Sequence, residues 1–292
     1  MADDPKHLNP AQLLRRAHLG RGALRSAFGT AGRVAPGMTA RLAEALFFRT
    51  PRGATRSEEV AFLDRANRFV VNAAGARVEG YLWGESGPLI VFAHGWLSNA
   101  GRVAPLAQAI LATGGRVAAF DAPGHGRSSG WRSSMPEFAA ALKAVVDSVG
   151  PAHALVGHSL GGAASVYAIS RGLPINRAVT IAAPADLSSW ADHFRDLVGL
   201  SPDVYERMQR RAERRLAITW ADLDIPTAAR SLTIPGLVIH DVHDPDVPWS
   251  EGVQLGQAWE GAEVMTTEGL GHRAILRDPE VIRRVVEFVA RS

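Results

Sequence analysis

Between Pro88 and Thr266 the chain alternates short apolar runs with segments long enough to form helices, and this alternation is the strongest constraint on its fold. The runs lack the polar residue at every second position that a strand with one wet face would show. They are typical of strands that helices cover on both faces, and intervening helices make such strands parallel. We therefore predict an α/β fold, a mostly parallel sheet flanked by helices, with strands near Leu89–Ala93, Arg116–Phe120, Ala154–Val156, Ala178–Ala182, Leu237–His240 and Glu263–Thr266.

Two segments depart from this alternation. Before it, Arg68–Asn72 and Val78–Trp83 flank Ala74 and Gly75, which predicts two strands joined by a tight turn. Within it, the stretch from Pro184 to Leu232 has no apolar run of the buried-strand type and carries a charged amphipathic helix pattern. We expect this stretch, at about 185–232, to form a helical cap over the strand ends.

The first 60 residues are predicted to form an N-terminal helical arm that lies against a main domain of residues 61–292. Glycines and Pro36 interrupt residues 8–48, which predicts several short helices rather than one long helix. Between Pro5 and Ala43 there is no Asp or Glu, whereas Lys6 and six arginines fall there. Such an arm fits either simple packing across the domain or a weak contact with a membrane surface or an acidic partner.

Composition excludes several kinds of chemistry. The chain has no cysteine, which excludes disulfides, thiolate nucleophiles and cysteine-bound metals. Its first residues are acidic where a secretory signal would be basic, and no run of 18 apolar residues occurs. We therefore expect a soluble, cytoplasmic protein without a transmembrane segment. The net charge of +3 gives no reason to expect a nucleic-acid partner, and the oligomeric state is left open.

The motif Gly157-His158-Ser159-Leu160-Gly161 follows an apolar run and precedes a helical segment. A serine on such a sharp strand-to-helix turn projects its hydroxyl clear of the backbone, and the two glycines let neighbouring chain pass close by. The helix N-terminus adds a positive dipole, and the Leu160 N–H faces the oxyanion that acyl transfer would form. We predict Ser159 as a nucleophile; the alternative is a glycine-rich structural turn.

From about Gly80 to Val289 the chain resembles the α/β-hydrolase superfamily, in its serine esterase and lipase branch. Besides the serine turn, His94-Gly95-Trp96 resembles the family's oxyanion turn, which implies that the Trp96 N–H is the second oxyanion donor. The segment Phe120–Ser128 is similar to a family loop that supports the site. Serine at position 159 argues against the epoxide hydrolases and haloalkane dehalogenases of this superfamily, which carry aspartate there.

The family order places the acid and then the histidine of the triad after the serine. Of the histidines beyond Ser159, His272 in Gly269-Leu-Gly-His matches the family pattern and is the expected general base. The acid that orients it is one of three aspartates, and the resemblance, an Asp-x-x-Val-Pro pattern, favours Asp244 over Asp241 and Asp246. We expect His94 and His158 to brace their turns through hydrogen bonds and His240 to be a core residue.

These motifs predict a carboxylesterase-like serine hydrolase that acts on a small-molecule ester or similar acyl bond through an acyl-enzyme. The same triad serves C–C bond hydrolases, lactonases and perhydrolases, and a ligand-binding protein that keeps the fold without its chemistry is a third alternative. No cofactor or metal is implied, because the phosphate-loop, dinucleotide and H-E-x-x-H patterns do not occur. Candidates for an apolar substrate pocket are Trp96, Leu187, Trp190, Trp249 and Leu270, and the alternative for each is packing in the core or the cap.

Overall fold

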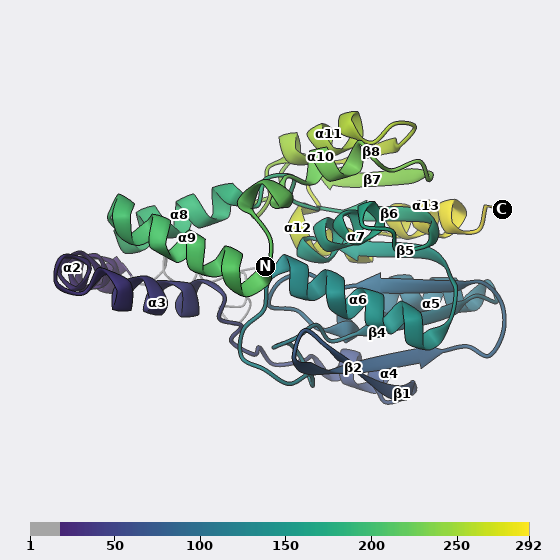
Figure 1. Ribbon diagram of the computed structural model, residues 1–292. Coiled ribbons are helices and arrows are strands. Elements are labelled where there is room, and N and C mark those ends of the chain that lie inside the picture. The colour runs from purple at the N-terminus through teal and green to yellow at the C-terminus, as the bar shows by residue number, and fades with distance from the viewer. Residues whose placement is uncertain (1–17, 292) are drawn as a thin grey trace.

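The computed structural model describes residues 18–291 and is built on one eight-stranded sheet (Figure 1). Neighbouring strands from β4 to β8 are parallel, whereas β1 and β2 are antiparallel. The predicted α/β class with a mostly parallel sheet is therefore confirmed. In sheet order the strands are β1 (Asn67–Ala73), β2 (Ala76–Trp83), β4 (Arg116–Phe120), β3 (Leu89–Ala93), β5 (Ala152–His158), β6 (Ile175–Ile181), β7 (Gly236–Asp241) and β8 (Glu263–Thr267).

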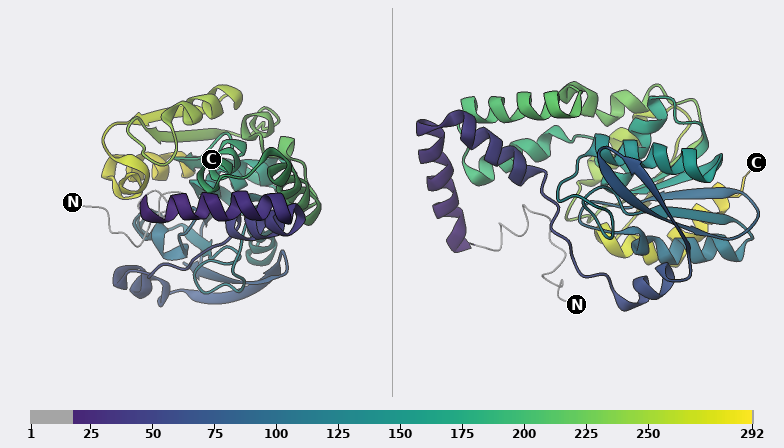
Figure 2. Two further views of the ribbon diagram at one scale, coloured as in Figure 1. Left: turned by 90° about the vertical axis from the view of Figure 1, so that its left-hand side faces the viewer. Right: turned by 60° about the horizontal axis from the view of Figure 1, so that its bottom comes forward.

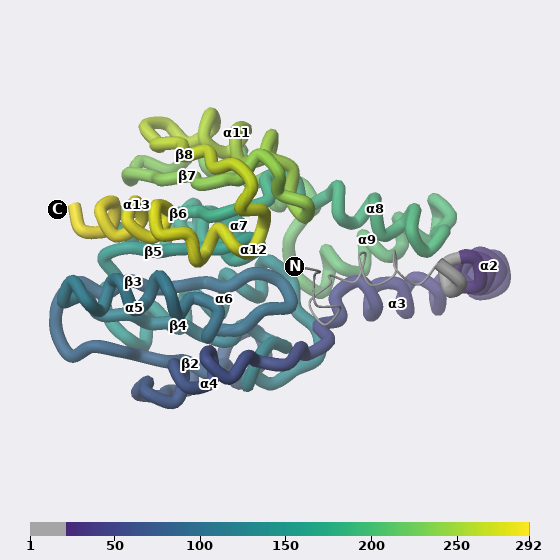
Figure 3. The backbone as a smooth tube through the Cα atoms, turned by 180° about the vertical axis from the view of Figure 1, so that it is seen from behind, coloured from purple at the N-terminus to yellow at the C-terminus, as the bar shows by residue number. Residues whose placement is uncertain are grey.

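Helices cover both faces of the sheet (Figures 1 and 3), and side chains alternate between two cores. Along β3, Val91 points into the first core, while its neighbours Ile90 and Phe92 point into the second. This explains why the strand sequences are apolar at every position. The first core packs under α6 (Met135–Val149), α7 (Leu160–Ser170), α10 (Ile225–Ala229) and α11 (Trp249–Ala258), and the second under α4 (Ser57–Leu63), η2 (Ala100–Val103), α5 (Ala104–Ala112), η4 (Ile275–Arg277) and α13 (Pro279–Val289).

The ends of these elements follow from local sequence. The turn between β1 and β2 consists of Ala74 and Gly75, both with positive φ (50° and 71°), as a two-residue hairpin requires. Helix α6 ends at Gly150, which has φ 95°. Helix α13 begins after Asp278, whose carboxylate accepts hydrogen bonds from the first free N–H groups of the helix.

Beyond the carboxyl ends of the strands, four helices form a separate layer that we call the helical lobe (Figures 1 and 2). It combines the N-terminal arm with part of the insertion between β6 and β7, and α3 packs along α9. The lobe has a small core of its own, which includes Phe28, Ala43, Phe194 and Met208. Its helices are α2 (His18–Val34), α3 (Pro36–Phe47), α8 (Ser188–Val198) and α9 (Pro202–Leu216).

Helix α2 corrects one expectation, because it runs unbroken through four glycines that were predicted to interrupt it. Each glycine costs a helix about 1 kcal/mol relative to alanine, but tertiary packing supplies most helix stability. Phe28 is buried in the lobe core, and a Cβ at Gly32 would lie only 3.2 Å from a methyl group of Val204 on α9. Of the arm's basic residues, the side chains of Arg25, Arg33 and Arg41 are described. Lys6, Arg15 and Arg16 lie outside the described residues.

The remainder of the insertion does not project into the lobe. Helix α10 packs against α7 and α11 in the main body, and η3 (Trp220–Leu223) lies between α9 and α10 in the chain. At the other end, the expected boundary at residue 60 falls within α4, where Phe62 stacks on Trp83 with ring centroids 4.5 Å apart. Within residues 18–291 no helix is both long enough and apolar enough to cross a bilayer.

Candidate active site

Ser159 stands on the turn that joins β5 directly to α7. Its backbone has φ 53° and ψ −128°, a strained conformation for a residue with a side chain. The N–H of Ser159 donates to the carbonyl oxygen of Ile181 at the end of β6 (2.9 Å), which helps to hold the strained turn in place. The serine is 7% exposed, and it opens the N-terminus of an eleven-residue helix.

Two glycines allow the turn after β3 to press against this serine. A Cβ at Gly161 would lie 2.3 Å from the carbonyl oxygen of Ala93, and a Cβ at Gly95 would lie 2.8 Å from the Cβ of Ser159. Any side chain at either position would therefore force the two turns apart. The close contact brings Trp96 and Leu160, the two expected oxyanion donors, to the same cavity as Ser159.

Two buried histidines hold the turn after β3 in position. His94 donates from Nδ1 to the carbonyl oxygen of Gly95 (2.7 Å) and accepts the N–H of Ala122 at Nε2 (3.0 Å). His125 accepts the N–H of Leu97 at Nε2 (3.2 Å). Each ring must be neutral because it accepts an N–H, and burial lowers the pKa of both, for His125 to about 3.

His272 and Asp244 meet although 28 residues separate them in sequence. His272 lies in the short helix α12 (Gly271–Ala274), and its Nδ1 is 2.7 Å from Oδ2 of Asp244. The Asp244 side chain is fully buried, and its Oδ1 accepts the N–H groups of Asp246 (2.8 Å) and Val247 (2.9 Å). A carboxylate fixed in this way accepts the Nδ1 proton, which leaves Nε2 of His272 as the basic nitrogen.

His158, next to the serine, positions the His272 segment as well as its own turn. Its Nε2 lies 2.8 Å from the carbonyl oxygen of His272, and the two rings are 4.8 Å apart. A carbonyl only accepts, so His158 carries its proton on Nε2. Burial and the neighbouring His272 lower the pKa of His158 well below its usual value. It is therefore a neutral donor that links the serine turn to the segment of His272.

The two other candidate acids contact different parts of this loop. Asp241, the last residue of β7, accepts the Leu270 N–H (2.9 Å) and the Thr267 hydroxyl (2.8 Å), so it braces the chain that leads to His272. Burial raises the pKa of Asp241, but these hydrogen bonds outweigh burial and lower the pKa overall. Asp246 lies 3.5 Å from the guanidinium of Arg273. Neither contact is to the His272 ring.

His240 lies behind Asp244 in the core. Its Nε2 is 3.0 Å from the carbonyl oxygen of Val247 and 3.6 Å from the Asp244 carboxylate. Burial lowers the pKa of His240. The ring therefore donates a proton to the Val247 carbonyl as a neutral group and supports the loop that holds Asp244.

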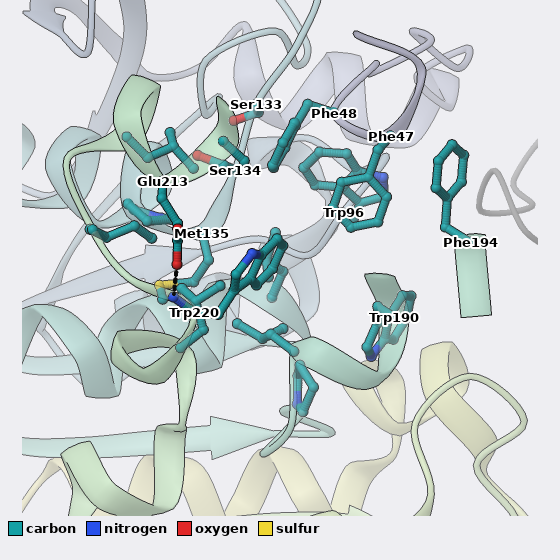
Figure 4. A pocket seen from close by; sticks show the side chains of 18 of the residues that line it. Phe47, Phe48, Trp96, Ser133, Ser134, Met135, Trp190, Phe194, Glu213 and Trp220 are labelled. Carbon is teal, nitrogen blue, oxygen red and sulfur yellow. Dashed lines mark hydrogen bonds between the residues drawn. The ribbon is translucent and has the colours of Figure 1, made fainter. Parts of the chain in front are cut away.

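Two cavities meet at Ser159. The large cavity lies between the carboxyl ends of the strands and the helical lobe (Figure 4). Its wall is mostly apolar and includes Trp96, Leu160, Leu187, Trp190 and Trp220. The small cavity has more polar walls: His272, Arg102, Asp246 and Arg273 line it together with Ser159 and Trp96.

Three of the five residues predicted from the sequence line the large cavity, and the other two do not. Leu187, Trp190 and Trp96 line it as expected. Trp249 lies elsewhere, because it begins α11, is 39% exposed and donates to the Thr266 hydroxyl (3.3 Å). Leu270 is also outside this cavity, in the loop braced by Asp241. These two candidates therefore do not line the large cavity.

The missed wall residues come from segments far from the motifs. Phe47 and Phe48 stand at the end of α3 in the N-terminal arm, and Phe194 comes from α8 (Figure 4). For Phe48 the sequence signal is the apolar pattern Leu42, Ala45, Leu46 and Phe48, which predicts a packed helix face without indicating its partner. Among the described residues no group of three or more His, Asp or Glu is placed to hold a metal ion.

Known proteins match the middle of the chain. A family model described as α/β hydrolase fold matches residues 88–223. A bifunctional esterase/perhydrolase from Acinetobacter calcoaceticus is 34% identical over 135 residues, which are 44% of this chain and 48% of that protein. A serine hydrolase-like protein from Danio rerio is 32% identical over 103 residues, 33% of this chain and 31% of the relative. The matched stretch thus spans about half of the first relative and about a third of the second.

The fold extends this similarity to most of the main domain. Est1E from Butyrivibrio proteoclasticus, whose structure contains ferulic acid, superposes with a TM-score of 0.60 at 20% identity. The match covers 76% of this chain and 96% of that one, and at such low identity it reports the fold alone. The sheet order, the family model and the curated relatives agree. The chain has the α/β-hydrolase fold, and residues 88–223 match the family model.

Proposed function

We propose that this protein is a serine hydrolase that cleaves carboxylic esters, or chemically similar acyl bonds, of small molecules. The triad would be Ser159, His272 and Asp244. The observation that carries the proposal is the 2.7 Å contact between His272 Nδ1 and the buried Asp244 carboxylate, beside a serine at φ 53° that shares a cavity with His272. A histidine oriented in this way makes the serine hydroxyl a nucleophile at neutral pH.

The reaction would run through an acyl-enzyme. His272 Nε2 accepts the Ser159 hydroxyl proton as the oxygen attacks the acyl carbon, and the Trp96 and Leu160 N–H groups stabilise the oxyanion. The imidazolium then passes its proton to the leaving-group oxygen as the ester bond breaks. In the second half, water gives one proton to His272, attacks the acyl carbon, and releases the acid while Ser159 recovers its proton.

The two cavities suggest where each part of the substrate binds. His272 must lie within hydrogen-bonding reach of the leaving-group oxygen in order to protonate it, and His272 lines the small cavity. The leaving group is therefore assigned to the small, more polar cavity. The acyl group is assigned to the large cavity, whose aromatic and aliphatic wall favours a bulky apolar acid. A large acyl group joined to a small alcohol is the expected substrate class.

Covalent labelling tests the nucleophile directly. A fluorophosphonate should label the wild-type protein once, on Ser159, and should not label Ser159→Ala. Ser133→Ala is a matched control, because it removes another serine hydroxyl that lines the large cavity. If Ser159→Ala is labelled as fast as wild type, the serine assignment is wrong. If wild type is not labelled, a ligand-binding role without chemistry becomes the better explanation.

A panel of 4-nitrophenyl esters then tests the substrate class. We expect kcat/KM to rise from acetate to longer or aromatic acids, because each added group removes apolar surface from water in the large cavity. A lactone and a substrate with a cleavable C–C bond belong in the same panel. Turnover of either at a higher kcat/KM than every ester would replace the esterase assignment and leave the triad intact.

Perhydrolysis is a second candidate, which the name of the Acinetobacter calcoaceticus relative favours. In this reaction hydrogen peroxide attacks the acyl-enzyme in place of water, one peroxide proton passes through His272 to Ser159, and a peracid leaves. The measurement is peracid formation from an ester and hydrogen peroxide, with Ser159→Ala as the blank. Equal peracid in both samples would attribute the product to uncatalysed chemistry.

A further inference from the structure

The outer surface of the helical lobe carries an apolar stripe that packing within the described residues does not cover. Val34, Met38 and Leu42 are 82%, 70% and 60% exposed. They are the three most exposed large apolar side chains in the part of the chain whose side chains are described, residues 22–291. Met38 and Leu42 are one turn apart on α3, and Val34 is the last residue of α2, two residues before α3 begins. Clustered apolar side chains that are this exposed form a candidate contact surface.

The stripe lies in a basic environment. Arg33 and Arg41 are exposed next to it, and neither forms an ion pair with any described residue. The lobe segments 18–47 and 188–216 contain ten arginines and six carboxylates. This excess of four positive charges exceeds the net charge of +3 of the whole chain, so the rest of the protein is close to neutral or slightly acidic. Positive charge is concentrated on the lobe.

The position of the stripe suits a contact with an extended surface. Figures 1 to 3 place α2 at one end of the molecule, opposite the C-terminus. The other side of α3 is already occupied, since Ala40 and Ala43 are buried in the lobe core and Glu44 is buried against α9. Among residues 22–291, therefore, nothing that packs on α3 needs to rearrange for the exposed stripe to meet another body.

The exposed stripe could be covered by a second copy of this chain or by a lipid surface, and charge distinguishes the two. A second copy docked on the same face about a twofold axis would bring two positively charged lobes together, and like charges would oppose the contact. An anionic lipid surface matches both features of this face. Its acyl chains can contact the apolar stripe, and its negative headgroups can contact the arginines.

We propose that the helical lobe docks on an anionic lipid surface through Val34, Met38 and Leu42, with Arg33 and Arg41 at the headgroups. Helix α3 has 12 residues and ends at Phe47, in the wall of the large cavity, so the docked protein holds that cavity within about 20 Å of the lipid. The surface contact stands on the exposed stripe and the charge of the lobe, and it does not depend on the proposed hydrolase activity.

Flotation with lipid vesicles tests this directly, using the full chain. Wild type should bind vesicles of phosphatidylcholine and phosphatidylglycerol (3:1) much more strongly than vesicles of phosphatidylcholine alone. Met38→Glu/Leu42→Glu should weaken binding at least tenfold, because it puts charge where the apolar contact forms. Arg33→Gln/Arg41→Gln should weaken it about fivefold per arginine. Raising the salt to 0.5 M should weaken wild-type binding by screening.

Controls separate docking from folding and activity. Val70→Glu changes a 50% exposed apolar residue on the edge strand β1 and should leave vesicle binding unchanged. Each variant should keep the wild-type melting temperature and the wild-type rate on a soluble acetyl ester. Absence of wild-type binding to anionic vesicles overturns the proposal, and so does equal binding by Met38→Glu/Leu42→Glu. A lipid-free wild-type dimer that the same double variant converts to monomer would assign the stripe to self-association instead.

Discussion

The sheet and the helical lobe contribute to one candidate site through different kinds of contact. On the sheet side, Ser159, Asp244 and His272 each stand within a few residues of the end of β5, β7 or β8. On the lobe side, the cavity wall forms where α3 packs against α9, which lies some 170 residues further along the chain. The proposed triad is thus positioned by strand ends, whereas the shape of the cavity depends on packing between segments far apart in the chain.

A charged network in the lobe shows how that packing is specified. Glu44 of α3 is buried, and its carboxylate accepts hydrogen bonds from Arg211 (3.1 Å) and Arg215 (2.9 Å) of α9. Arg215 also donates to Glu137 at the start of α6 (3.0 Å) and lies 4.6 Å from the centre of the Phe48 ring. One network therefore joins the arm, the insertion, the main body and the cavity wall.

The largest expected effect falls on the sheet side. Ser159→Ala should lower kcat by about 10⁶, as removal of a triad serine does in other enzymes, while the melting temperature stays close to wild type. The serine hydroxyl supplies chemistry and little packing. The measurement is kcat for a 4-nitrophenyl ester together with a thermal melt. Retention of even a tenth of the wild-type rate, with normal folding, would remove Ser159 from the mechanism.

Asparagine in place of the triad acid should give the next largest effect. Asp244→Asn keeps the side-chain shape but favours the wrong imidazole tautomer of His272, and kcat should fall by about 10⁴. Asp246→Asn should stay within about tenfold of wild type, because Asp246 contacts Arg273 rather than the imidazole. Measuring kcat for Asp241→Asn, Asp244→Asn and Asp246→Asn side by side decides the assignment. A crippled Asp241 or Asp246 variant beside an active Asp244 variant would contradict it.

Variants in the lobe should change selectivity rather than chemistry. Phe47→Ala and Trp190→Ala each remove apolar wall from the large cavity, and kcat/KM for a long-chain or aromatic ester should fall about tenfold relative to acetate. Leu42→Ala is a matched control on α3, because Leu42 faces outward and is 60% exposed. An equal loss on every ester would mean that Phe47 and Trp190 act through packing alone.

The smallest expected effect concerns the brace beneath His272 and depends on pH. The hydrogen bonds of Asp241 hold its pKa below the usual value in the folded state, so the charged carboxylate stabilises folding above pH ~4. This contribution is lost as the pH falls through the lowered pKa. Near pH 7, Asp241→Asn should lower the free energy of unfolding by about 1 kcal/mol, which corresponds to a melting temperature lower by about 2–4 °C.

Melting temperatures of wild type and Asp241→Asn should therefore converge as the pH falls below ~4. A difference that stays constant from pH 7 to pH 3 would show that the stabilisation comes from shape and not from the charge of Asp241. Asp147→Asn serves as a control, because Asp147 pairs with Lys143 on the surface of α6, where an ion pair contributes little at any pH.

The sequence predicts the sheet well because burial on both faces leaves a direct mark on it. Every residue of β3 is apolar since both neighbouring cores need it, and helix ends such as Asp278 and Gly150 carry capping chemistry in one or two residues. The glycines of α2 misled the prediction for the opposite reason. Their propensity is local and weak, and packing against α8 and α9 outweighs it.

For the candidate site, sequence by itself determined which side chains are candidates for reactive chemistry and which strand ends present them. A nucleophile turn needs its glycines beside it, so the motif around Ser159 is readable in five consecutive letters. Only the tertiary structure decided which of three aspartates contacts His272, and that two phenylalanines of the N-terminal arm line the large cavity. Contacts between segments distant in the chain depend on packing geometry, and packing geometry leaves no local pattern in the sequence.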